Sequence, residues 1–211
     1  MPANRRVLLL PGAGGDPEFW SPVAQRLPAR WDKVTLTWPG LGDQPRDHSV
    51  RGLDDLVALV AGELTRPSDL IAQSMGGVVA VGAAARHPEQ IRRLVLVATS
   101  GGFDPAAHHA EDWRQAYRRN YPDAADWITE HVADYGPAIA EITAPTLLIW
   151  GDSDPISPIS VATTLATALP DARLWVLKGG AHDLAHPQVV ARWIIDHLSR
   201  DGPAARSDPS Q

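Results

Sequence analysis

The chain has 211 residues, of which 44% are hydrophobic and 21% charged, and this composition is typical of one globular domain with a sizeable core. It has no cysteine, which excludes disulfides, thiolate metal sites and a catalytic thiol. The formal net charge of −6 argues against a nucleic-acid-binding surface, because such a surface needs a basic stripe.

The first element is an apolar run at residues 7–10, closed by Pro11-Gly12, which predicts a strand buried on both faces. The run is too short for a signal peptide or a membrane span, so we expect a cytoplasmic protein without membrane association. Comparable apolar runs predict five more strands, at residues 33–38, 70–72, 93–98, 145–150 and 173–177. Helix patterns lie between and after them, at residues 17–27, 52–64, 75–87, 157–168 and 187–198.

Strands that alternate with helices in this way predict an α/β fold, a doubly wound parallel sheet with helices on both faces. Ligands bind such sheets at the carboxyl ends of the strands. Four glycine-rich or acidic turns lie at these ends, after Leu10, after Trp38, at Ser74 and after Trp150. The sequence therefore predicts a functional site at this edge of the sheet.

Residues 103–143 interrupt the alternation, because aromatic side chains are scattered among charged ones and no long apolar run occurs. We expect a small, mostly helical cap here, inserted into a core of residues 1–102 and 144–200. Trp113 and Trp127 of the cap are candidates for lining a substrate pocket, although packing of the cap onto the core explains them as well. The last segment, residues 201–211, is rich in Pro, Ala, Ser and Asp and is predicted to be disordered.

Ser74 lies where a predicted strand turns into a predicted helix. Small residues stand two positions before it, at Ala72, and two and three positions after it, at Gly76 and Gly77. A sharp strand-to-helix turn needs small neighbours at these offsets, because strand and helix backbones pass close to its side chain. The pattern is that of a nucleophile elbow, normally Gly-x-Ser-x-Gly, with Ala72 in place of the first glycine. The alternative is that Ser74 only caps the helix.

A serine hydroxyl needs a base to remove its proton and a third group to orient that base. Candidate acids follow the fifth predicted strand, at Asp152 and Asp154, and a candidate base, His182, follows the sixth. In this order of serine, acid and histidine the chain resembles the α/β-hydrolase fold family. The motifs that carry the resemblance are Pro11-Gly-Ala-Gly-Gly, Trp38-Pro-Gly-Leu-Gly-Asp, Ala72-Gln-Ser-Met-Gly-Gly, Trp150-Gly-Asp-Ser-Asp-Pro and Gly180-Ala-His-Asp.

The resemblance covers nearly all of residues 7–199 and implies a six-stranded parallel sheet in the order 2-1-3-4-5-6. The family's usual N-terminal strand pair is not expected here, since only six residues precede the first predicted strand. The backbone N–H groups of Ala13 and Met75 match the family's oxyanion hole. The usual His-Gly of the loop after the first strand is Pro11-Gly12 here, which leaves the backbone donor in place but removes a side chain that helps to hold the loop.

The resemblance also implies roles for single side chains. Ser74 matches the nucleophile and His182 the general base. Asp154 matches the acid, because the family pattern has a glycine three residues before this aspartate and a proline four residues after it. Asp152 remains the alternative acid.

Other histidines carry weaker signals. His108 and His109 stand near Glu111 and Asp112 and could suggest a metal site, but no further ligand is spaced to complete it. Exposed cap residues are the simpler interpretation, and no metal is expected. Four more histidines are expected at the surface: His48, His87, His131 and His197.

The leading hypothesis is a serine hydrolase that cleaves a carboxylic ester or thioester through an acyl-enzyme. The expected partner is a small-molecule acyl substrate, and no cofactor or nucleic acid is implied. Hydrolysis of a C–C bond or a lyase reaction on the same scaffold is the alternative, since a fold does not determine a function. A non-catalytic ligand-binding protein is a third hypothesis, against which the complete set of serine, acid and histidine argues.

Overall fold

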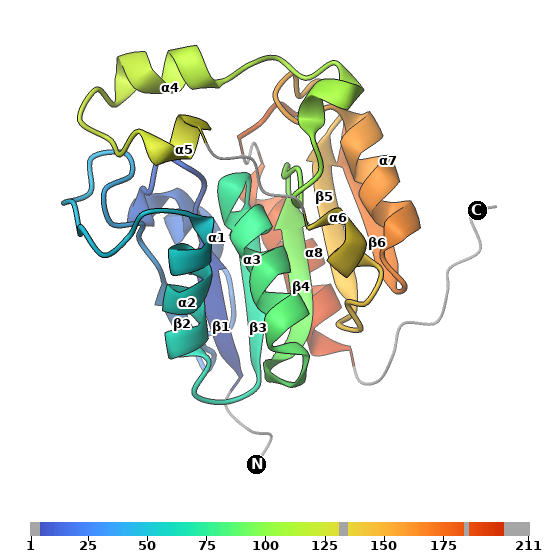
Figure 1. Cartoon of the computed structure of the whole chain (residues 1–211). Helices are drawn as coiled ribbons and strands as arrows, with labels where there is room; N and C mark the ends of the chain where they lie inside the picture. The colour runs from blue at the N-terminus through green and yellow to red at the C-terminus, as the bar shows by residue number, and fades with distance from the viewer. Residues whose placement is uncertain (1–4, 131–134, 184–185, 201–211) are drawn as a thin grey trace.

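The computed structural model of the chain describes residues 5–130, 135–183 and 186–200. Its centre is a parallel six-stranded sheet in the order β2-β1-β3-β4-β5-β6, which confirms the predicted order (Figure 1). The strands are β1 (Arg6–Leu10), β2 (Asp32–Thr35), β3 (Ser68–Gln73), β4 (Ile91–Val97), β5 (Thr146–Gly151) and β6 (Ala172–Leu177). Each neighbouring pair is parallel, and the helical segments between the strands supply the crossover connections that parallel strands need.

Side chains alternate across the sheet and form one hydrophobic cluster on each face. In β1, Val7 and Leu9 belong to one cluster, while Leu8 and Leu10 belong to the other, as the two-residue period of a strand dictates. All four side chains are fully buried. The continuous apolar run at residues 7–10 therefore corresponds to a strand that is covered on both faces, whereas β6, at the edge of the sheet, leaves Trp175 and Val176 exposed.

Helices cover both faces of the sheet (Figure 1). One hydrophobic cluster joins the sheet to α1 (Ser21–Ala24) and α8 (Pro187–Ser199), and the other joins it to α2 (Leu53–Glu63), α3 (Met75–Arg86) and α7 (Ile159–Ala168). These helices match the predicted ones with small shifts of their ends, except for the first. The doubly wound α/β architecture predicted from the sequence is confirmed.

The first predicted helix, residues 17–27, is instead two short pieces. A 3-10 turn spans Pro17–Trp20, and α1 follows it directly. Pro22 is the physical reason, because proline lacks the N–H that a continuous α-helix would donate to the carbonyl of Glu18.

The second strand is shorter than predicted and ends at Thr35. Leu36 still donates its N–H to the carbonyl of Leu9 at 2.9 Å, after which the chain leaves the sheet. Trp38 then turns inward, is fully buried, and donates its indole N–H to the carbonyl of Pro11 at 2.8 Å. The predicted strand therefore extended to residue 38 because Trp38 is part of the core, although it lies outside the strand.

The described residues of the segment 103–143 form short helical pieces joined by loops. They include a 3-10 turn at Pro105–His108, α4 (Arg114–Asn120), α5 (Trp127–Glu130) and α6 (Gly136–Ile139). Figure 1 shows α4 and α5 above the carboxyl ends of the strands. Apolar side chains of the segment share one cluster with the sheet and α3, namely Tyr117, Ala124, Ile128, Ile139 and Ile142. The segment packs onto the core, and we refer to it below as the cap.

Some predictions fall outside the described residues, namely the disordered tail at 201–211 and the surface position of His131. Of the residues that the structure describes, none belongs to a helix that is long and apolar enough to cross a membrane. His48 is exposed as predicted, and His87 is half-buried.

The prediction that His197 lies at the surface is wrong. This residue of α8 is 5% exposed, and its Nε2 lies 3.2 Å from the carbonyl oxygen of Pro145. It follows the buried Val190 and Ile194 by seven and three residues, which places it on the buried face of the helix. Burial lowers the pKa of His197 to about 4, and the nearby Arg93 adds to the effect.

We expect His197 to make the protein less stable as the pH falls from about 6.5 to about 4. In this range the unfolded chain binds a proton at residue 197 and the folded protein does not, so acidification favours unfolding. The whole shift corresponds to about 3 kcal/mol in the free energy of unfolding. Urea unfolding across this pH range should show a smaller loss of stability for His197→Gln than for the wild type.

The exposed His48 supplies the matched control. His48→Gln removes an imidazole without touching the core and should keep the wild-type dependence of stability on pH. If His197→Gln and the wild type lose stability equally on acidification, the buried histidine is not the cause.

Candidate active site

Ser74 lies in the tight turn between β3 and α3. Its backbone has φ 51° and ψ −123°, a conformation that a side-chain-bearing residue adopts only when its surroundings enforce it. The turn is held by two hydrogen bonds, from Ser74 N–H to the carbonyl of Val97 at 2.9 Å and from the Thr99 hydroxyl to the Ser74 carbonyl at 2.6 Å. The Ser74 side chain makes no capping hydrogen bond to α3, so the geometry is that of a nucleophile elbow.

The small residues around Ser74 are required by close backbone approach. A Cβ on Gly76 would lie 2.3 Å from the carbonyl oxygen of Pro11, at the end of β1. A Cβ on Gly77 would lie 2.5 Å from the side chain of Thr99. Ala72 occupies the place of the usual first glycine, and its methyl group is fully buried in the hydrophobic cluster beneath α3.

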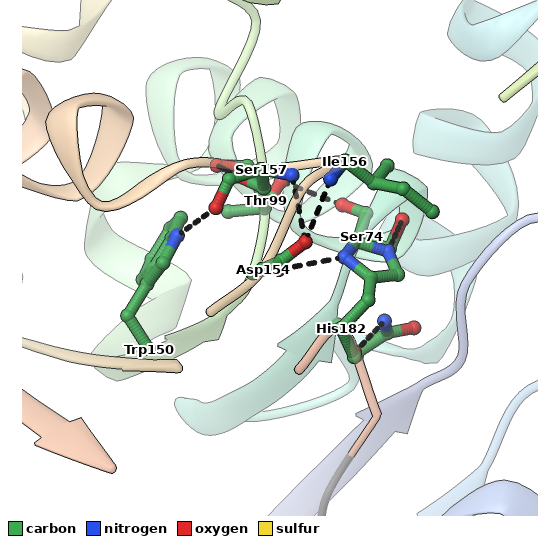
Figure 2. A network of polar contacts seen from close by, with 8 residues as sticks. Ser74, Thr99, Trp150, Asp154, Ile156, Ser157 and His182 are labelled. Atoms are coloured by element: carbon green, nitrogen blue, oxygen red, sulfur yellow. Dashed lines mark hydrogen bonds and ion pairs between the residues drawn. The ribbon is translucent and has the colours of Figure 1, made fainter. Parts of the chain in front are cut away.

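His182 lies between Ser74 and Asp154, as Figure 2 shows. Its Nε2 is 3.0 Å from Ser74 Oγ and its Nδ1 is 2.8 Å from Asp154 Oδ2. The three residues follow β3, β5 and β6. In the sheet β5 and β6 are neighbours and β4 separates them from β3, and the carboxyl ends of these parallel strands lie at one edge. A proton can therefore pass from the hydroxyl to the imidazole while the carboxylate orients the ring.

Asp154 is held rigidly by the turn that carries it. Its second oxygen, Oδ1, accepts the N–H groups of Ile156 and Ser157, both at 2.9 Å. The carbonyl of Ser157 in turn accepts the indole N–H of Trp150 at 2.8 Å (Figure 2). The Asp154 side chain is fully buried, so its carboxylate faces His182 from a fixed position.

Asp152, the alternative acid, lies in a different environment. It is exposed, and its Oδ1 accepts the N–H of Gly179 at 2.6 Å and the hydroxyl of Ser153 at 3.1 Å. The contact with Gly179 joins the loop after β5 to the loop after β6, whereas Ser153 belongs to the same loop as Asp152. The structure thus brings Asp154, and not Asp152, within hydrogen-bond distance of His182.

Gln73 contributes a contact that was not expected from the sequence. This buried residue precedes the elbow serine, and its side-chain amide donates to the backbone carbonyl of His182 at 3.2 Å. The bond restrains the loop that carries the imidazole. Nothing in the local sequence distinguishes this glutamine, because its partner lies 109 residues later in the chain.

A cavity of about 510 Å³ opens at Ser74 and His182 between the sheet edge and the cap. Ala13 and Met75, the candidate oxyanion-hole residues, both line it. Met75 is the first residue of α3, and the first N–H groups of a helix have no partner within the helix. The peptide N–H of Met75 is thus at the positive end of a helix, where it suits a negatively charged oxygen.

The two cap tryptophans behave differently. Trp113 lines the cavity, whereas Trp127 packs against the hydrophobic cluster and is not among the described residues that line the cavity. Only Trp113 is therefore placed to touch a substrate. The His108 and His109 region forms no metal cluster, since no three His, Asp or Glu side chains in the described part of the chain gather as a metal site needs.

A family model described as the alpha/beta hydrolase family matches residues 7–193. The chain belongs to the α/β hydrolase family. The matched region contains Ser74, Asp154 and His182. The predictions of this family, of its fold and of an enzyme of the hydrolase type are confirmed.

Two relatives within the α/β hydrolases carry the same name, pimeloyl-(acyl-carrier protein) methyl ester esterase. The protein of Neisseria meningitidis serogroup B is 28% identical, over 93% of this chain and 93% of its own length. The protein of Aromatoleum aromaticum is 29% identical, over 90% of this chain and 96% of its own. A solved membrane phospholipase A, described as a bacterial virulence factor, has a TM-score of 0.77 at 23% identity, over 94% of this chain and 79% of its own.

Proposed function

We propose that the chain is a carboxylic ester hydrolase that works through an acyl-enzyme on Ser74. The observation that carries the proposal is the hydrogen-bonded series from Ser74 to His182 to Asp154, at 3.0 and 2.8 Å. A serine in a purely structural turn would need neither a base at this distance nor a buried carboxylate behind that base. The complete series also argues against a protein that only binds a ligand.

In the first half of the reaction, Ser74 Oγ attacks the ester carbonyl carbon while His182 Nε2 accepts the hydroxyl proton. Asp154 accepts the Nδ1–H of the ring, which keeps Nε2 free to act as the base and stabilises the imidazolium that forms. The N–H groups of Ala13 and Met75 stabilise the negative charge on the carbonyl oxygen. His182 then gives its proton to the departing alcohol, and the acyl group remains on Ser74.

In the second half, a water molecule replaces the alcohol. His182 accepts a proton from the water as its oxygen attacks the acyl carbon, and the same N–H groups stabilise the oxyanion. The intermediate then breaks to the free acid, and Ser74 Oγ regains its proton from His182. A thioester would follow the same steps with a thiol as the leaving group.

The walls of the cavity suit the hydrocarbon part of an acyl chain. They are mainly apolar or aromatic and include Phe19, Leu53, Phe103, Trp113, Tyr121 and Ile156. Burial of apolar substrate surface against such walls supplies binding free energy. Because two relatives are named as methyl ester esterases of an acyl chain, methyl esters of acyl chains are the first substrates to test.

A substrate panel tests the proposal. We would compare acyl methyl esters, p-nitrophenyl esters, acyl-CoA thioesters and a β-diketone whose cleavage breaks a C–C bond, with Ser74→Ala as the control. We expect ester hydrolysis that Ser74→Ala loses. Equal turnover by the wild type and Ser74→Ala would contradict the proposal. Cleavage of the diketone alone, and its loss in Ser74→Ala, would assign the same serine to C–C hydrolysis.

We expect Trp113→Ala to change which acyl chains the enzyme prefers, because this indole lines the cavity and its removal enlarges the cavity. One pocket contact typically alters discrimination between neighbouring chain lengths by about 10-fold. The measurement is kcat/KM across a series of p-nitrophenyl esters. Trp127→Ala removes a tryptophan outside the cavity lining and should keep the wild-type preference, so an equal change in both variants would mean that the effect is indirect.

A further inference from the structure

The loop after β1, residues 11–16, carries the Ala13 N–H that the proposed function assigns to the oxyanion hole. Glycines flank Ala13 on both sides, at Gly12 and Gly14, so the backbone is intrinsically free to rotate. A turn hydrogen bond from Gly15 N–H to the Gly12 carbonyl, at 3.0 Å, orders part of the loop. The histidine that usually helps to hold this loop in the family is replaced by Pro11.

A cap residue bonds to this loop directly. The hydroxyl of Tyr117, in α4, donates to the carbonyl of Ala13 at 2.9 Å and accepts the N–H of Gly42 at 2.9 Å. Both partners are backbone groups of core loops, after β1 and after β2 respectively. The single hydroxyl therefore joins the cap to two core loops at the edge of the candidate active site.

The loop after β2 supports this arrangement. A Cβ on Gly42 would lie 1.8 Å from the carbonyl oxygen of Gly14, so the two loops are in direct backbone contact. The cap is also bound to the β2 loop elsewhere, because Ala125 N–H donates to the Gly40 carbonyl at 2.8 Å. The loop after β2 is therefore held by the cap at Gly40 and by the loop after β1 at Gly14. Its Gly42 N–H fixes the position of the Tyr117 hydroxyl, which in turn restrains Ala13.

The tyrosine is well suited to this task. It is 7% exposed, and its ring lies 5.5 Å from that of Trp113 and 5.1 Å from that of Tyr121, centroid to centroid. Burial raises the pKa of Tyr117 above its ordinary value, so the hydroxyl keeps the proton that it donates to Ala13. The peptide unit whose carbonyl it holds shares the Ala13 Cα with the unit that carries the Ala13 N–H. Fixing the first unit limits the rotation of the second.

We propose that Tyr117 is a positioning residue for the oxyanion hole, which acts from the cap on the backbone of Ala13 and makes turnover depend on the docked cap. The inference rests on the proposed function, because it needs an oxyanion to be stabilised at this N–H. It assigns Tyr117 no contact with the reacting atoms. Its effect is on the transition state and not on substrate binding, since the loop must be aligned when charge develops on the carbonyl oxygen.

The test is Tyr117→Phe, which deletes the hydroxyl and keeps the ring. Loss of an oxyanion donor costs about 10²- to 10³-fold in kcat, and a donor that is only loosened should cost about 10-fold or somewhat more. We expect this loss in kcat with little change in KM. Inhibition by a trifluoromethyl ketone, whose serine adduct carries an oxyanion, should weaken by the same factor as kcat/KM.

Tyr135→Phe is the matched control. Tyr135 is a half-buried tyrosine whose hydroxyl also makes a hydrogen bond, to Asp54 at 3.2 Å, and unlike Tyr117 it does not line the cavity. This variant should keep the wild-type kcat and inhibitor affinity. Amide hydrogen exchange over residues 11–16 should accelerate in Tyr117→Phe and stay unchanged in Tyr135→Phe, which reports on the loop without any use of activity.

Wild-type kcat, inhibition and exchange in a folded Tyr117→Phe would overturn the proposal, and so would a rise in KM with kcat unchanged. If the protein unfolds when the hydroxyl is lost, Gly42 offers a second route. Gly42→Ala strains the β2 loop against Gly14 at an unchanged Tyr117 and should reproduce the kcat loss and the faster exchange. A wild type that neither hydrolyses esters nor binds the ketone would refute the proposed function instead, and the exchange result would then decide only whether Tyr117 restrains the loop at residues 11–16.

Discussion

Ser74→Ala is expected to lower kcat for ester hydrolysis by about 10⁶-fold, the loss seen when the nucleophile of a well-studied serine hydrolase is removed. The reason is that alanine removes the oxygen nucleophile that lies 3.0 Å from His182 Nε2 on a turn beside the cavity. The residual rate would come from binding and from the oxyanion-hole N–H groups alone. KM and the thermal unfolding midpoint should change little, since the change removes one oxygen atom from a half-buried site.

Covalent labelling distinguishes Ser74 from its neighbours. A fluorophosphonate reacts with a serine that a base activates, so the wild type should gain the mass of one adduct and Ser74→Ala none. Ser100 is the most informative competitor, because it lines the same cavity. Ser153 is an exposed serine whose hydroxyl bonds to Asp152, which makes Ser153→Ala a suitable control. An adduct that maps to Ser100 or Ser153 would refute the assignment of the nucleophile.

The sheet could be predicted because its four inner strands, β1, β3, β4 and β5, are buried on both faces, whereas the edge strands β2 and β6 are only partly covered. Runs such as residues 7–10 and 145–150 have no polar face that would need contact with water. Each is bounded by a proline, a glycine or a charged turn. Errors occurred where a side chain entered the core outside a strand or a helix ended early. Trp38 extended an apparent strand, and Pro22 divided an apparent helix.

The candidate site could be predicted to the extent that parallel topology brings the ends of strands together. Ser74, Asp154 and His182 follow three different strands, and knowledge of the sheet order suffices to place them at one edge. The choice between Asp152 and Asp154 was harder, because the two differ only in which way a short turn directs them. The amides of Ile156 and Ser157 settle that direction, and they belong to the same turn.

Contacts that depend on distant parts of the chain could not be predicted. Tyr117 bonds to Ala13 across 104 residues and Gln73 bonds to His182 across 109, and no local pattern marks either pair. The role of Trp127 was ambiguous for the same reason. The local sequence around an aromatic residue of an insertion looks the same whether its side chain packs on the core or faces the cavity. The burial of His197, in contrast, could have been predicted from the sequence, since the helical period places this residue on the buried face of α8.

The contact through Tyr117 changes how cap variants should be interpreted. A substitution that only reshapes the cavity wall, such as Trp113→Ala, should alter substrate preference and leave the chemistry of Ser74 intact. A substitution at the Tyr117 hydroxyl should slow all esters by a similar factor, because the oxyanion is common to them. The two kinds of effect arise from side chains in ring contact on the same short helical segment.

Asp154→Asn should lower kcat by about 10⁴-fold, the size of the effect in the best-studied triad. An asparagine retains an oxygen for the Ile156 and Ser157 amides, so the turn should stay folded. Its NH₂ group then faces His182 Nδ1, where it donates a hydrogen bond and does not accept one. The ring would adopt the tautomer with the proton on Nε2, which leaves no lone pair to take the proton of Ser74.

Asp152→Asn is the matched control, since it makes the same chemical change two residues away on the same loop. Its oxygen can still accept the Gly179 N–H, and its carboxylate does not touch His182. We expect kcat within a few-fold of the wild type and an unfolding midpoint similar to that of Asp154→Asn. The measurement is kcat for one ester with thermal unfolding of both variants. A larger loss for Asp152→Asn than for Asp154→Asn would transfer the acid role to Asp152 and would require the loop after β5 to rearrange during turnover.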